Sequence, residues 1–266
     1  MTKAPTIFPY RNVFEAIERA LINRGSPSIE SSLNAFKSYG SRTLSDEEYF
    51  SILVLVTFYS GFRASIVSAK KNVIREYFPS VATVASYKKR MIRRIMADTR
   101  MIRNERKIIA CIENATALAT IIKKYGSMKQ YIDSHAPFDP FENLMLLKES
   151  LEATFSYLGG VTVYHFMTDI GLPVLKPDRV ICRIFKRLDL IQEERQLLKT
   201  VIQGRKFAEV TGHPIRYIDR VLVAHGQAST PEYSIEQGVC LADPRCGVCP
   251  IVSDCNYGLS RKDRRK

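Results

Sequence analysis

Four cysteines near the C-terminus form the densest group of potential ligands in the chain. Cys240, Cys246, Cys249 and Cys255 lie within sixteen residues, separated by five, two and five residues. Four thiolates suit either a tetrahedral zinc ion or a [4Fe–4S] cluster. Structural zinc usually takes paired C-x2-C knuckles, and this stretch has only one such pair. We therefore favour the cluster, with zinc as the alternative, and expect it to staple a loop-rich C-terminus without a redox role.

A lone aspartate, Asp178, precedes the basic helical stretch PDRVICRIFKRLDL. Its position is typical of a helix N-cap, and capping alone would account for it. A carboxylate there can also stabilise a cationic sugar or orient an attacking water. Cleavage of a glycosidic bond through an oxocarbenium-like state requires that chemistry. Asp178 is therefore the candidate catalytic residue.

Two adjacent glycines divide two apolar helical segments in the stretch LGGVT. Glycine allows a tight turn and the close approach of another backbone. The N-terminus of the following helix offers unpaired amides that suit a phosphate. Such a helix–hairpin–helix can grip DNA backbone without reading sequence, although an ordinary loop between helices is the alternative. The candidate DNA contacts are Gly159, Gly160, Thr162 and Arg179.

The charge of the chain also indicates a polyanionic partner. The 266 residues carry a formal net charge of +13, with a pI of about 9.5. Nine of the cations fall within the twenty residues Lys88–Lys107, and nucleic acid is the commonest polyanion. The alternative is that the excess lysine and arginine only increase the solubility of the protein.

The chain has the composition of a globular protein, with 45% hydrophobic residues. No apolar run approaches the roughly 20 residues of a membrane span, and no secretory signal opens the sequence. We expect a cytoplasmic, nucleoid-associated protein that binds double-stranded DNA. We expect no membrane association, no obligate protein partner and a monomeric state.

Helical periodicity dominates, and strict apolar–polar alternation is missing, so the predicted class is all-α. Helices are expected over residues 45–61, 63–78, 80–96, 104–126, 141–158, 177–190, 193–212 and 214–227, with a short apolar helix after the two glycines. The break at GLPVLKP is the expected boundary between two lobes. One lobe would span 45–174, with the hairpin at about 150–171. The other would combine 1–44 and 175–266.

The order of these features resembles that of the helix-hairpin-helix DNA glycosylases. The LGGVT hairpin, the aspartate heading a basic helix, VLVAHGQ and the cysteine loop are similar to the endonuclease III and adenine glycosylase branch. The stretches SGFRASIVSAKKNVIREYF, RMIRNERKIIACIENATA and VTVYHFMTDIGL resemble the 3-methyladenine DNA glycosylase I branch. The resemblance covers about Ser45–Cys255. It implies a two-lobe all-α fold, DNA across the cleft, a flipped nucleotide and catalysis by Asp178.

The chain departs from the family's patterns in three places. Bifunctional members carry a lysine just after the hairpin that forms a Schiff base with the sugar, and Tyr164 stands there instead. This difference predicts a monofunctional enzyme that leaves an abasic site. The 3-methyladenine branch uses a pocket glutamate and a tryptophan, where this chain has Val56 and Ala64. That branch's zinc ligands are also missing, and the four-cysteine loop takes their place.

These replacements predict a roomier, less polar pocket, unless neighbouring side chains fill it. Tyr59 and Phe62 are candidates for stacking on a flipped base, worth about 1–3 kcal/mol per base. The base-pocket candidates are Val56, Tyr59, Phe62, Ala64 and Tyr164. A bulky modified base, such as a glucosylated hydroxymethylcytosine of phage DNA, is the suggested substrate. The alternatives are an alkylpurine repair glycosylase, a bifunctional glycosylase-lyase and a non-catalytic DNA-binding module.

Overall fold

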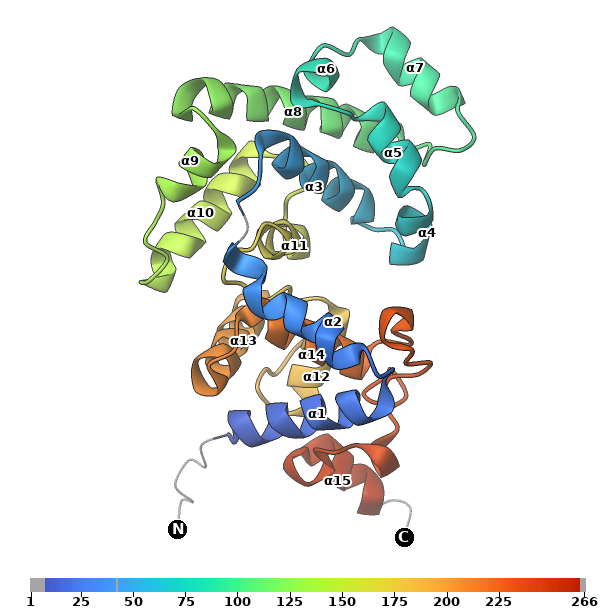
Figure 1. The fold of residues 1–266 in the computed structure, drawn as a ribbon, viewed down its shortest axis with the longest axis vertical. Helices are drawn as coiled ribbons and strands as arrows, with labels where there is room; N and C mark the ends of the chain where they lie inside the picture. The colour runs from blue at the N-terminus through green and yellow to red at the C-terminus, as the bar shows by residue number, and fades with distance from the viewer. Residues whose placement is uncertain (1–7, 42, 264–266) are drawn as a thin grey trace. The chain divides into compact units, whose positions relative to one another are not determined.

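The computed structural model describes residues 8–41 and 43–263 (Figure 1). These residues form helices and loops, and the only β-pairing within the described ranges is one isolated bridge between Thr230 and Ile235. The prediction of an all-α class is therefore confirmed. No helix in the described part of the chain is long and apolar enough to cross a membrane.

The chain divides into two compact units. The central unit is Thr43–Ile170, and the terminal unit comprises the described parts of Met1–Arg42 and Gly171–Lys266. The terminal unit thus combines segments from the two ends of the sequence.

The central unit is built around its longest helix, α8 (Glu105–Tyr125). This helix contacts α3, α6, α7 and α9, while α3 also contacts α11, which in turn contacts α10. The helices of this unit are α3 (Asp46–Tyr59), α4 (Ala64–Ala69), α5 (Lys71–Tyr77), α6 (Val81–Ala85), α7 (Lys89–Ala97), α8, α9 (Met128–Asp133), α10 (Phe141–Thr154) and α11 (Val161–Asp169). Because α3 packs against neighbours on more than one side, it is apolar around most of its circumference.

The start of α3 follows directly from local sequence. The side chain of Ser45 accepts a hydrogen bond from the Glu48 amide, and the Glu48 carboxylate accepts one from the Ser45 amide. This capping box satisfies two otherwise unpaired amides. The predicted start of this helix at residue 45 is confirmed.

Two predicted helices are each broken in the structure. The segment 63–78 forms α4 and α5, divided at Lys70, and the segment 80–96 forms α6 and α7, divided by Ser86–Lys88. The segment predicted as a helix over 141–158 ends at Thr154, and the one predicted over 193–212 begins only at Leu197. Beyond Thr154 the apolar pattern continues into the turn, because Phe155 and Leu158 are buried there.

The terminal unit is centred on α14 (Ile215–Gly226), which contacts α1, α2, α12, α13 and η1. The elements of this unit are α1 (Tyr10–Arg24), α2 (Ile29–Asn34), η1 (Ala35–Ser41), α12 (Arg179–Arg187), α13 (Leu197–Thr211), α14, η2 (Pro231–Tyr233), η3 (Cys246–Val248), η4 (Val252–Asp254) and α15 (Asn256–Asp263). Val13, Phe14, Ile17 and Leu21 of α1 are buried in its core.

Candidate active site and cysteine pocket

The two glycines form a tight turn between α10 and α11. Gly160 has a φ of +59°, which favours glycine, and Gly159 is exposed, with nothing within 4 Å of where a Cβ would stand. The Thr162 hydroxyl accepts a hydrogen bond from the Gly159 amide at 2.9 Å and lies 2.6 Å from the Tyr157 carbonyl. The hydrogen bonds of Thr162 therefore stabilise the turn. The open space beside Gly159 leaves room for a DNA backbone to approach.

An acidic side chain lies against this turn. The Gly160 amide donates to Oε1 of Glu152 at 3.2 Å, and the other oxygen of Glu152 pairs with Lys148. The Glu152 carboxylate therefore accepts a hydrogen bond from an amide that the sequence analysis predicts to bind a phosphate. A DNA phosphate bound at this amide would have to displace Glu152, since both groups are anionic acceptors.

Glu152→Gln is expected to tighten binding of an unmodified duplex by about three- to tenfold, because like-charge repulsion next to the turn is removed. Fluorescence anisotropy with a labelled duplex at low salt measures the change. Glu149→Gln is the matched control, because Glu149 is exposed on the same helix and carries the same charge. Equal effects of the two substitutions would show that only net charge matters.

Two buried polar residues of α8 hold the loop that enters the turn. The Asn114 side chain donates to the Ser156 carbonyl at 3.0 Å and accepts from the Ser156 amide at 2.7 Å. Lys107 donates to the Thr57 and Ser60 carbonyls at the end of α3, and its ammonium lies 4.6 Å from the Tyr157 ring centroid. Burial lowers the pKa of Lys107 to about 8. These contacts tie the hairpin loop to the α3–α4 turn.

The base-pocket candidates do not share one surface. Tyr59 and Phe62 are half-buried and Ala64 is exposed, whereas Val56 and Tyr164 are only 1% and 4% exposed. Burial raises the pKa of Tyr164. Tyr59, Phe62 and Ala64 therefore offer accessible surface around the α3–α4 turn, and Val56 and Tyr164 are buried.

His165, a neighbour of Tyr59, was not identified from the sequence. The ring of His165 lies 5.6 Å from that of Tyr59, and its Nε2 lies 3.2 Å from Oδ2 of Asp169. Both members of the pair are half-buried on α11, directly after the hairpin. The spacing of four residues between a histidine and an aspartate on a predicted helix was the available signal.

Asp178 caps α12 with one of its two oxygens. Oδ1 accepts hydrogen bonds from the amides of Val180 and Ile181 at 2.9 and 3.1 Å. Oδ2 lies 3.4 Å from Nζ of Lys176, and the side chain is 23% exposed. The cap predicted from sequence is present, and it leaves the second oxygen beside a cation and within reach of solvent. Arg179 is exposed on the first turn of the same helix.

A buried carboxylate supports the turn that carries Asp178. Asp219 of α14 accepts a hydrogen bond from the Lys176 amide at 3.3 Å and pairs with Arg216 at 3.0 Å. Burial raises the pKa of Asp219, against the opposing effect of Arg216. Sequence alone gave no sign of this role, since Asp219 lies 43 residues beyond Lys176.

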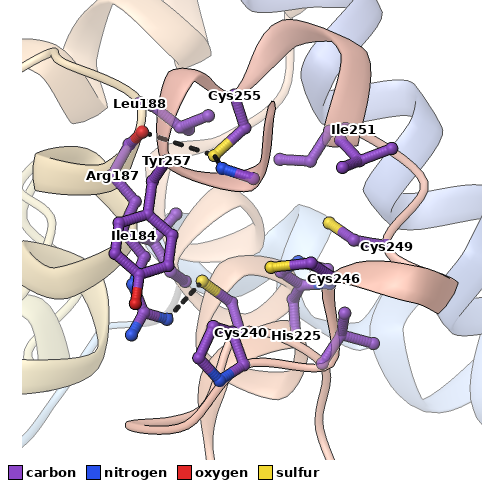
Figure 2. Close-up of a pocket in the computed structure, with 14 residues that line it drawn as sticks. Ile184, Arg187, Leu188, His225, Cys240, Cys246, Cys249, Ile251, Cys255 and Tyr257 are labelled. Carbon is purple, nitrogen blue, oxygen red and sulfur yellow. Dashed lines mark hydrogen bonds between the residues drawn. The ribbon is translucent and has the colours of Figure 1, made fainter. Parts of the chain in front are cut away.

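The four cysteines line one pocket (Figure 2). Their sulfur atoms turn toward a shared space that is otherwise walled mainly by apolar side chains such as Ile184, Leu188 and Ile251. Arg187 donates to Sγ of Cys240 at 3.2 Å, and the Gly258 amide to Sγ of Cys255 at 3.4 Å. N–H groups aimed at sulfur are the usual support of a metal–thiolate site.

Burial acts on the pKa of three of these thiols. Burial raises the pKa of Cys249 to about 11, and it also raises the pKa of Cys240 and of Cys255. In the described part of the chain, no three Cys, His, Asp or Glu side chains converge closely enough to hold a single metal ion. Four thiols in one pocket fit a metal centre, since its positive charge would reverse these shifts.

Comparison with known proteins supports the architecture. Residues 37–154 match the family model for methyladenine glycosylase, a stretch that ends before the hairpin turn, Asp178 and the cysteines. A trapped endonuclease III–DNA covalent intermediate is 15% identical over 88% of this chain and 97% of its own, with a TM-score of 0.55.

Two further solved structures share the fold. The 8-oxoguanine DNA glycosylase of Thermotoga maritima is 19% identical over 81% of this chain and 96% of its own, with a TM-score of 0.53. The 8-oxoguanine glycosylase/lyase of Methanocaldococcus jannaschii, in complex with DNA, is 19% identical over 79% and 95%, with a TM-score of 0.54. The family match thus covers less than half of the 266 residues, and the three solved structures share the all-α fold of this chain.

Proposed function

We propose that the protein is a monofunctional glycosylase that removes a damaged or modified base from double-stranded DNA and leaves an abasic site. The observation that carries this proposal is the geometry of Asp178. Two backbone amides fix one of its oxygens, so the other is held in a defined position at the start of α12. A positioned carboxylate is what an oxocarbenium-like transition state requires.

In this mechanism water adds to C1′ of the sugar as the bond to the base nitrogen breaks. The base leaves with the bonding electrons and takes up a proton, and the attacking water loses one. Asp178 stabilises the developing positive charge on the sugar or orients that water. The hairpin turn and Arg179 hold phosphates, while Tyr59 and Phe62 offer rings for stacking. The absence of an amine at Tyr164 supports hydrolysis rather than Schiff-base chemistry.

A bulky modified base is the proposed substrate, with glucosylated hydroxymethylcytosine as an example. The support is the small size of Val56 and Ala64, the absence of tryptophan from the chain, and the exposure of Ala64. The competing substrate is 3-methyladenine, in keeping with the description of the matching family model.

Mass spectrometry of bases released from alkylated, oxidised, deaminated and phage-modified DNA tests this proposal, with Asp178→Asn run on each substrate. Release of a bulky base by the wild type alone is the expected result. Release of 3-methyladenine at a normal rate would overturn the substrate proposal. Tight DNA binding with no release from any substrate would favour a binding module.

We also propose that the cysteine pocket holds a [4Fe–4S] cluster, with zinc as the alternative. A zinc ion draws its four sulfurs to about 3.8 Å from one another, given Zn–S bonds of roughly 2.3 Å. The support for either centre is that the four thiols share one pocket with mainly apolar walls, and the spacing of the cysteines favours the larger cluster. Cys240, Cys246, Cys249 and Cys255 would be its ligands, and Arg187 would offset their negative charge.

Lys176 favours a second candidate, the glycosylase-lyase. Its amine lies 3.4 Å from the Asp178 carboxylate. An amine there would attack C1′ as the base leaves with the bonding electrons. Loss of a proton and opening of the sugar ring would give the Schiff base, and loss of a C2′ proton would then expel the 3′ phosphate.

Borohydride trapping separates the two candidates, because it reduces a Schiff base to a stable protein–DNA adduct. We expect no adduct with the wild type on a cleavable substrate. An adduct that disappears in Lys176→Gln would support the lyase mechanism in place of hydrolysis. Lys199→Gln is the control and should retain the adduct, because Lys199 lies on α13 and contacts Gln192.

A further inference from the structure

A dense group of positive charges lies on helix α7, which carries none of the residues assigned above. Helix α7 has exposed cations along one face, and no acidic residue occurs between Lys88 and Ala97. The exposed cations are Lys88, Lys89, Arg90, Arg93 and Arg94. The last four recur at positions i, i+1, i+4 and i+5, which brings them to one side of a helix with 3.6 residues per turn. We call these five residues the α7 basic face.

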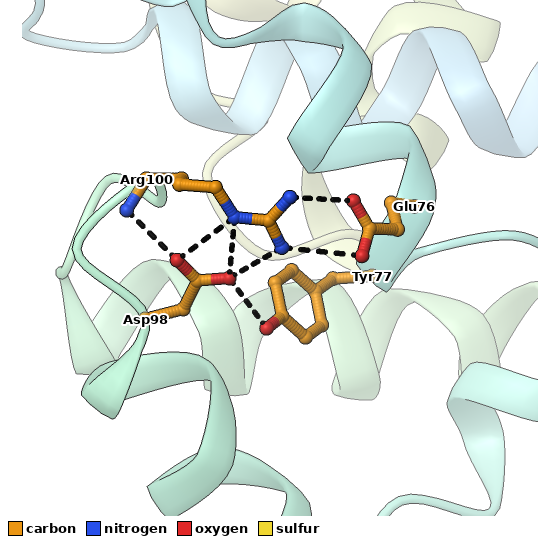
Figure 3. Close-up of polar contacts among 4 residues, drawn as sticks. All are labelled: Glu76, Tyr77, Asp98 and Arg100. Carbon is orange, nitrogen blue, oxygen red and sulfur yellow. Dashed lines mark hydrogen bonds and ion pairs between the residues drawn. The ribbon is translucent and has the colours of Figure 1, made fainter.

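The acidic side chains near the end of α7, Glu76 and Asp98, pair with Arg100 (Figure 3). Arg100 donates to both oxygens of Glu76 at 3.2 and 3.3 Å and pairs with Asp98 at 2.7 Å, and the Tyr77 hydroxyl also donates to Asp98. The bonds from Arg100 and Tyr77 hold the pKa of Asp98 well below its usual range. This network anchors the C-terminal end of α7 to α5. Within the described residues, no salt bridge engages any member of the α7 basic face.

The opposite side of α7 is occupied by the protein itself. Ile95 is fully buried, and α7 packs against α8. An amphipathic helix that inserts into a membrane surface needs a free apolar face, and this helix has none to offer. Its free surface is cationic only, which complements a phosphate backbone.

The α7 basic face is also separate from the hairpin within the central unit. Figure 1 shows α7 on one side of α8, with α3 and α11 on the other. The helices α7, α8, α3 and α11 pack in that order, so two helices lie between α7 and α11. A duplex that rests on the N-terminus of α11 therefore meets a different side of α8 from the one that carries the α7 basic face.

We propose that the α7 basic face is a second, sequence-independent binding site for double-stranded DNA, which holds a duplex segment distinct from the one at the hairpin. The contacts go to phosphates, so they carry no base specificity. A protein with two such surfaces bridges two duplexes and passes directly between them. This proposal goes beyond base removal and does not depend on which base is released.

The test compares the full-length protein with a neutralised variant, Arg90→Gln/Arg93→Gln/Arg94→Gln, on unmodified DNA. Each lost phosphate contact lowers the slope of log Kobs against log salt by about 0.9, so the slope should fall by about 2–3. Capture of a fluorescent duplex by protein bound to an immobilised duplex should also be lost. Arg90→Lys/Arg93→Lys/Arg94→Lys is the matched control, because it keeps the charge and should keep both properties.

Retention of bridging and of the full salt slope by the Gln variant would overturn the proposal. A smaller slope without any bridging by the wild type, growing with the length of one duplex, would also overturn it, because α7 would then extend a single site. Neither readout requires base release. Failure of the glycosylase proposal therefore shows in the base assay and leaves this result intact.

Discussion

Asp178→Asn is expected to reduce base release by a factor of about 10²–10⁴ and to leave the protein folded. Asparagine caps helices about as well as aspartate, so its side-chain oxygen still accepts from the Val180 and Ile181 amides. The substitution removes the negative charge opposite a cationic sugar and leaves the cap. Single-turnover release of the base at saturating enzyme measures the effect, and thermal unfolding verifies the fold.

Asp189→Asn is the matched control for this prediction. Asp189 is exposed just beyond the other end of α12, and its carboxylate accepts a hydrogen bond from Asn256. Its φ of 57° suits asparagine as well as aspartate. The control loses the same charge from the same unit and should retain activity. If Asp178→Asn released base as fast as this control, Asp178 would be only a helix cap, and the catalytic assignment would fail.

Capping residues and apolar periodicity predicted where most helices lie. They did not predict the helix breaks that depend on tertiary contacts. The capping box involves only Ser45 and Glu48, three residues apart, so the start of α3 could be predicted from the local sequence. The break between α4 and α5 at Lys70 was not, because buried Val67 and Ile74 lie on either side of it and preserve a helical period across the turn. A periodic pattern reports burial, and burial continues through a bent segment.

The candidate site divides in the same way. Asp178, the two glycines and the four cysteines stand out by residue type and spacing within short windows. Lys107 contacts a carbonyl 50 residues away, and Asn114 contacts a loop 42 residues away. Glu152 pairs with the Gly160 amide eight residues on. Such partners become visible only when the chain has folded, so the sequence did not reveal these supporting residues.

Cys249→Ser is expected to abolish iron binding and to lower the thermal stability of the protein strongly. In a small metal-stapled segment, the free energy of metal binding is folding free energy. The segment from Cys240 to α15 has only short helical elements of its own, η3 and η4, and Ile251 is the one fully apolar side chain within it that the core buries. Without the metal centre, little apolar burial remains to order this segment.

Cys111→Ala provides the control, because Cys111 is a buried thiol in the other unit and should leave the iron content unchanged. Iron and acid-labile sulfide per chain, measured with the absorbance of the purified protein, give the direct readout. A brown wild type with four irons and a colourless Cys249→Ser variant are expected for a [4Fe–4S] cluster. One zinc per chain in a colourless wild type would establish the alternative instead. No metal in either protein would make the four thiols ordinary free cysteines and would refute the proposed metal centre.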